Sequence, residues 1–183
     1  MNNNIDESNI VYSKPVLEFI TVANEYCLFF EKADNYSTED ILQYFQKIAP
    51  LLYLKGSVIP NVVVTDPSLN ERFVTEEQWE SIFKTLREKF GQQDVYYIHD
   101  HNYDTEETSL SDNMADIYQD MKDFIMLYQN AMLYAKENAV FEIRRLFQNH
   151  WGIRIINALK AIHQILYKDA IDPELFQDDD LLE

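Results

Sequence analysis

Residues 13–30 read SKPVLEFITVANEYCLFF, and this stretch decides the fold class. Ser13 is a suitable N-cap, and Pro15 falls in the first turn, where its missing N–H costs little. Apolar residues then recur at spacings of three and four, the period of a helix face; they are Val16, Phe19, Ile20, Ala23, Cys27 and Phe30. The opposite side is also largely apolar. The stretch therefore predicts a central helix, buried over much of its circumference.

Further helices are predicted on both sides of residues 92–110. Ser37 with Asp40, and Thr75 with Gln78, have the spacing of capping boxes in front of two more helical patterns. A fourth pattern begins after Ser109 or Ser111, and a fifth runs from about residue 138 to residue 166. Gly152 lies inside the fifth pattern, where it either separates two helices or only weakens one.

One short segment has the character of a strand. Residues 95–98 are β-branched and aromatic, and we expect them to pair with residues 62–65, leaving residues 99–110 as a surface loop. The prediction is a mainly α fold: a compact bundle of five or six helices with at most a minor two-stranded hairpin. We expect one domain over residues 13–168, a disordered tail at 1–12 and an acidic, frayed tail at 169–183.

Composition limits the classes of function. The chain has 183 residues and 46% apolar content, enough for one domain with a substantial core. Its net charge of −17 disfavours nucleic acid and anionic membranes as partners, because both repel an acidic surface. Cys27 is the single cysteine, so no intramolecular disulfide forms. Residues 1–8 lack the pattern of a secretory signal and no apolar run would span a bilayer, so we expect a cytoplasmic protein.

Four segments resemble a bacterial family known as domain of unknown function 5063. They are residues 17–27, LEFITVANEYC; 50–55, PLLYLK; 115–120, ADIYQD; and 157–163, NALKAIH. The likeness extends over roughly residues 13–168 and concerns helix faces. It implies a compact helical bacterial protein, and it brings no catalytic residues with it.

Four aspartates recur at near-helical spacing in the fourth pattern: Asp112, Asp116, Asp120 and Asp123. Such a row could bind a divalent cation, since Mg²⁺ and Ca²⁺ prefer oxygen ligands. On a helical wheel, however, the row lies opposite the apolar stripe centred near Met114. We therefore interpret it as a solvated face.

Two candidate histidine sites, one at His99 and His101 and the other at His163, have both a functional and a structural interpretation. In an extended segment His99 and His101 project to one side, and with Asp104 they form a possible Zn²⁺ or Fe²⁺ ligand set. The pattern is short and common by chance, so an unliganded loop is favoured and no cofactor is expected. His163 lies on the predicted buried stripe, where a hydrogen-bonded core histidine is favoured over a general base.

Charge is distributed unevenly along the chain. Residues 92–130 hold nine acids and one base, a net −8, whereas residues 136–168 hold six bases and two acids, a net +4. Either the two segments pair internally, which we favour, or Arg144, Arg145 and Arg154 form a site for an anion or a partner.

No catalytic motif accompanies these features, and 25 aromatic residues supply rings for interfaces. The leading hypothesis is a non-enzymatic protein-interaction or regulatory domain with a protein partner or self-association. The alternatives are a metal-dependent enzyme using the His99/His101 loop and an acidic mimic of nucleic acid.

Overall fold

The computed structural model describes residues 9–99 and 104–168. Within them, six α-helices and one antiparallel hairpin form a mainly α fold, which confirms the predicted fold class. The elements in chain order are α1 (Lys14–Phe30), α2 (Thr38–Ser57), α3 (Glu76–Phe90), β1 (Val95–His99), β2 (Thr105–Ser109), α4 (Leu110–Tyr128), α5 (Leu133–Leu146) and α6 (Gly152–Leu166).

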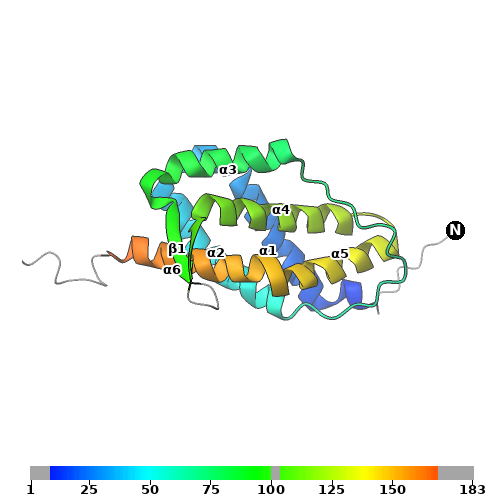
Figure 1. Cartoon of the computed structure of the whole chain (residues 1–183). Helices are drawn as coiled ribbons and strands as arrows, with labels where there is room; N and C mark the ends of the chain where they lie inside the picture. The colour runs from blue at the N-terminus through cyan, green and yellow to red at the C-terminus, as the bar shows by residue number, and fades with distance from the viewer. Residues whose placement is uncertain (1–8, 100–103, 169–183) are drawn as a thin grey trace, which may run out of the picture.

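Helix α4 lies at the centre of the bundle. It packs against α1, α3, α5 and α6, and Figure 1 shows it between α3 and the α5–α6 segment. Thirteen of its nineteen residues are buried, so almost its whole circumference faces other elements. The α1 helix predicted to be central packs on it, and the Tyr26 hydroxyl donates to the Met114 carbonyl at 3.0 Å.

Local signals placed most helix starts correctly. The Ser37–Asp40 and Thr75–Gln78 capping boxes both form, at the starts of α2 and α3. Ser109 is the N-cap of α4, since its side chain accepts the Asp112 amide. Ser111 is buried instead, and its hydroxyl donates to Asp94 at 2.7 Å.

The last helical pattern is continuous across Gly152. Helix α5 passes through a π-helical turn, Phe147–Trp151 (η4), directly into α6. Gly152 keeps right-handed helical dihedral angles, so it does not break the helix. The π-helical turn contains an extra residue compared with an α-helical turn, which rotates the buried face of α6 relative to α5.

The predicted strand exists, but its predicted partner was wrong. β1 pairs with β2, with Tyr97 opposite Glu107, and residues 62–65 form no strand. Those residues belong to the coil between α2 and α3, where Val62 is buried and Val63 is 80% exposed. Residues 105–109 are therefore a strand and not the expected loop.

The boundary predicted near residue 12 also changes. Ile10–Tyr12 form a 3-10 turn, and Val11 is fully buried beneath the Tyr128 hydroxyl, which donates to the Val11 carbonyl at 2.8 Å. The packed domain thus begins before residue 13. Residues 1–8 of the tail predicted at 1–12, and the tail predicted at 169–183, lie outside the described residues.

No helix in residues 9–99 and 104–168 combines the length and the apolar character needed to cross a bilayer.

Candidate functional site

The aspartate row of α4 faces the protein interior. Asp120 is 2% exposed, and Asp112, Asp116 and Asp123 are partly buried. The interpretation of this row as a solvated face was wrong. The helical wheel placed the apolar stripe of α4 correctly. The opposite face of α4, which carries the aspartates, is covered as well, by α3, the π-helical turn and α6.

His150 connects two of these aspartates to the π-helical turn. Its Nδ1 lies 2.6 Å from Asp120 Oδ2, and its Nε2 lies 3.6 Å from Asp116 Oδ2. Trp79 of α3 donates its indole N–H to Asp116 Oδ1 at 2.9 Å. Single π-helical turns are frequent at functional sites, because they change the direction of one side chain within a helix.

Arg154, one turn further along, completes the polar cluster. Its guanidinium lies 2.6 Å from Asp116 Oδ2 and 2.9 Å from Asp112 Oδ2, and it donates to the side-chain Oδ1 of Asn113 at 3.0 Å. Acidic and basic segments distant in sequence are paired here, as the favoured interpretation of the charge asymmetry predicted.

The protonation of the cluster follows from these contacts. Hydrogen bonds to Asp116 and Asp120 raise the pKa of His150 to about 9, although burial and the Arg154 charge oppose the shift. For Asp116, burial acts to raise the pKa, but His150 and Arg154 outweigh it and the pKa is lowered. The contacts with Asp116 and Asp120 thus favour the imidazolium form of His150, whereas the Arg154 side chain 3.3 Å from its Nε2 opposes it.

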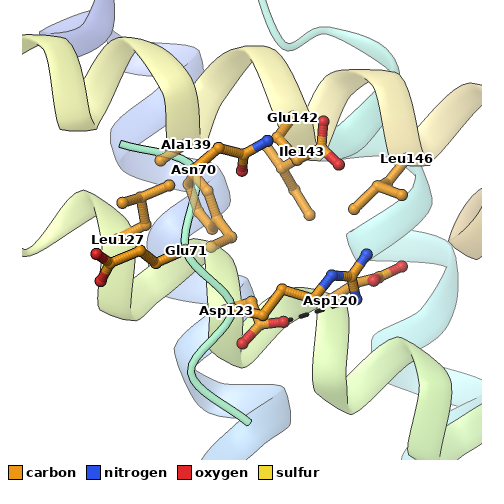
Figure 2. A pocket seen from close by; sticks show the side chains of 11 residues that line it. Asn70, Glu71, Asp120, Asp123, Leu127, Ala139, Glu142, Ile143 and Leu146 are labelled. Carbon is orange, nitrogen blue, oxygen red and sulfur yellow. Dashed lines mark ion pairs between the residues drawn. The ribbon is translucent and has the colours of Figure 1, made fainter. Parts of the chain in front are cut away.

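A pocket opens beside the C-terminal half of the row. Figure 2 shows Asp120 and Asp123 of α4 across from Ile143 and Leu146 of α5, with the coil carrying Asn70 and Glu71 along one side. We call this the α4–α5 pocket; its cavity volume is about 80 Å³. Its complete lining is Asn70, Glu71, Arg72, Asp120, Asp123, Phe124, Leu127, Ala139, Glu142, Ile143 and Leu146.

Asp123 also holds the coil that forms one wall of the pocket. Its Oδ1 accepts the backbone N–H groups of Phe73 at 2.7 Å and Val74 at 2.8 Å. Arg72 Nη1 lies 3.8 Å from Asp123 Oδ2. Burial raises the pKa of Asp123, while the two backbone hydrogen bonds and Arg72 act in the opposite direction.

A second concave region lies between the hairpin and α6, which are adjacent in Figure 1. It has two shallow hollows of about 320 and 430 Å³. The two hollows follow one another along α6 and have different lining residues; together we call them the hairpin–α6 groove. Its hairpin side includes Val95, Tyr96 and Ile98, and its α6 side includes Ile153, Arg154, Ala161, Ile165 and Lys168.

The three arginines predicted as an anion or partner site have separate partners. Arg144 donates to the Ile59 carbonyl at 3.1 Å, and Arg145 pairs with Glu142 at 2.7 Å. Arg154 belongs to the polar cluster and also lines the hairpin–α6 groove. The structure does not bring them together, and a role in partner binding remains a prediction.

The metal hypothesis rests on three residues at the hairpin. His99 is exposed at the end of β1, with its Nδ1 3.4 Å from the Thr105 hydroxyl, and Asp104 precedes β2. His101 lies outside the described residues, so the structure does not test this ligand set. Within the described part of the chain, no group of three or more His, Cys, Asp or Glu side chains is placed to hold a metal ion.

His163 is exposed, so its prediction as a core histidine was wrong. The buried face of α6 runs through Ile155, Ala158 and Ile162, and His163 lies about 100° further round the helix. Its ring packs on Tyr167 at a centroid distance of 4.7 Å. The histidine that does enter the interior is His150, which no sequence motif had singled out.

Comparisons with known proteins agree with this architecture. The family model described as domain of unknown function (DUF5063) matches residues 10–168. The crystal structure of protein BF1032 from Bacteroides fragilis is similar, with a TM-score of 0.79 and 31% sequence identity over 87% of this chain and 96% of that chain. No curated protein matches the sequence.

Proposed function

The chain belongs to the DUF5063 family, a domain of unknown function, and we propose its function from geometry. It is a non-enzymatic interaction domain that binds an extended segment of a protein partner. The binding site in this proposal is the hairpin–α6 groove. The observation that carries it is an edge strand beside an open, partly apolar groove.

The first support is the edge strand itself. Within the described residues β1 pairs with β2 alone, so its other edge has backbone groups available for a further strand. An extended peptide can add to such an edge through main-chain hydrogen bonds, while neighbouring side-chain pockets supply specificity. The groove next to β1 provides such pockets, lined by Tyr96, Ala161 and Ile165.

The second support is the exposure of apolar side chains around the groove. Ile153 is 53% exposed and Val95 is 46% exposed, and both line it. Apolar residues near the centre of an interface, with polar residues at the rim, are typical of protein-binding surfaces. Here Lys168 and Glu106 supply charges of both signs at the rim.

The polar cluster supports a binding role more than a catalytic one. Arg154 and His150 are already paired with Asp112, Asp116 and Asp120, so each charged group has its counter-ion within the fold. These paired acids also count against the hypothesis of a nucleic-acid mimic, which needs a continuous acidic surface. The lone Cys27 is a buried free thiol, and we propose a cytoplasmic location on that basis.

Site-specific photo-crosslinking in the native host tests the proposal. A photoreactive amino acid replaces Val95 or Ile153 in the groove, and in two control chains it replaces Leu28 or Phe141, each 43% exposed on other helices. We expect a discrete protein adduct from both groove positions and none from the controls. Mass spectrometry then identifies the adduct, and twice the chain's own mass would identify a second copy as the partner.

Adducts of equal yield at groove and control positions would contradict the proposal. So would the lack of any adduct at the groove positions while all four proteins are folded and expressed to the same level.

A further inference from the structure

Two of the residues that line the α4–α5 pocket each have one buried carboxylate oxygen without a hydrogen-bond donor among the described residues. These oxygens are Asp120 Oδ1 and Asp123 Oδ2. Asp120 uses its other oxygen to hold His150, and Asp123 uses its other oxygen for two backbone N–H groups. Buried polar atoms are nearly always paired, so two oxygens without a hydrogen bond, on two residues that line the same pocket, point to a donor from outside the chain.

The charges around the pocket select a cation. Its lining holds four carboxylates: Glu71, Asp120, Asp123 and Glu142. Three cations face them, because His150 pairs with Asp120, Arg145 with Glu142, and Arg72 lies 3.8 Å from Asp123. The local charge is therefore −1 when His150 is protonated, and one positive charge would neutralise it.

The rest of the lining is apolar and suits a short carbon chain. Phe124 and Leu127 of α4 line the pocket together with Ile143 and Leu146 of α5. The volume of about 80 Å³ is several times the roughly 10–15 Å³ that one water needs. A metal ion fits less well, because Mg²⁺ and Ca²⁺ take six or more oxygen ligands, and no three His, Cys, Asp or Glu side chains among the described residues are placed to hold one.

We propose that the α4–α5 pocket binds a small primary alkylammonium ion. Its nitrogen lies between Asp120 Oδ1 and Asp123 Oδ2, and its alkyl chain lies against Phe124, Leu127, Ile143 and Leu146. The three N–H donors of an ammonium group are enough to hydrogen-bond both of these oxygens at once. This site is separate from the hairpin–α6 groove, and the inference does not depend on the proposed function.

Calorimetric titration of the full chain at pH 7 with n-butylammonium tests the inference, with n-butanol as the neutral probe of equal chain length. We expect saturable one-to-one binding of n-butylammonium. Charge-assisted hydrogen bonds should make it bind at least about tenfold more tightly than n-butanol.

Variants locate the binding. Asp120→Asn and Asp123→Asn should each weaken n-butylammonium binding by about tenfold or more, because each removes one negative charge from the pocket. Asp112→Asn is the matched control, since it removes a carboxylate from the same face of α4 outside the pocket, and its affinity should stay within about twofold of wild type. Ala139→Leu leaves every charge in place and fills the cavity, so it should abolish binding even if an aspartate variant folds poorly.

Three results would overturn the inference. The first is no saturable binding of n-butylammonium, which would mean that water alone pairs the two oxygens. The second is equal affinity for n-butanol, which would make the pocket an apolar cavity without charge selection. The third is binding that survives Ala139→Leu or is lost in Asp112→Asn, which would place it elsewhere.

Discussion

Gly56 lies in the last turn of α2 directly against the ring of Trp151, and replacing it with alanine should destabilise the fold. A Cβ at Gly56 would lie 2.1 Å from Trp151 Cη2 and 2.9 Å from Cζ2. Carbon atoms in contact are normally about 3.5–4.0 Å apart, so the ring would have to move by about 1.4 Å.

The ring has little freedom to move. Trp151 is fully buried, its indole N–H donates to the Ile143 carbonyl at 3.1 Å, and it packs on Phe19 and Phe147. Overpacking of this kind costs about 3 kcal/mol at the upper end of its usual range. Alanine recovers up to about 1 kcal/mol through its higher helix propensity. The expected net loss is about 2 kcal/mol, a fall in Tm of roughly 4–8 °C for a chain of this size.

Urea unfolding followed by tryptophan fluorescence measures this loss. The control is Ser57→Ala, an exposed position in the same turn, which should change the free energy of unfolding by less than about 0.5 kcal/mol. Adding Trp151→Phe to Gly56→Ala should relieve part of the clash. The double-mutant cycle should then give a favourable coupling energy between the two positions. Unchanged stability of Gly56→Ala, or strictly additive effects in the cycle, would refute the packing described for this site.

Three further predictions concern other parts of the structure. Because the pKa of His150 is raised from 6.5 to about 9, its imidazolium contributes stability that is complete below about pH 6.5 and is lost as the pH rises through 9. Urea titrations from pH 6 to 10 should show a loss of roughly 1–2 kcal/mol, discounted for solvent screening, that is absent in His150→Gln; a wild-type curve of the same shape as the variant's would contradict the pairing. Asp123→Ala removes the acceptor of the Phe73 and Val74 amides, so hydrogen exchange at those two amides should accelerate by more than about tenfold while α1 amides stay protected; equal acceleration throughout would indicate global destabilisation instead. Thr75→Ala breaks the capping box of α3 and should lower the free energy of unfolding by about 1 kcal/mol in the same urea assay. Thr75→Ser keeps the hydroxyl and should have nearly the wild-type free energy of unfolding.

Local signals in the sequence predicted much of the helical fold. The capping boxes at Ser37 and Thr75 involve residues three apart, and a helix start depends on little else. The family resemblance, drawn from helix faces alone, is confirmed by the family match over residues 10–168.

Features set by distant contacts were not predictable in this way. The sequence TEETS of β2 shows no apolar alternation, and it becomes a strand because β1 and the α4 N-terminus position it. Asp120 was assigned to solvent because its counter-ion, His150, is 30 residues away on a different helix. His163 was misplaced because the apolar residues at helical spacing from it, Leu159 and Leu166, are only partly buried, whereas the buried face of α6 runs through Ile155, Ala158 and Ile162.

The central claim is that the hairpin–α6 groove holds a protein partner. The most direct test is the dissociation constant of the cross-linked partner for the wild-type chain and for Ile153→Asp, with Phe141→Asp as the control of similar exposure. A charge placed in the groove should weaken binding by about tenfold or more, whereas Phe141→Asp should leave it unchanged. Equal affinity of the wild-type and Ile153→Asp chains would contradict the claim.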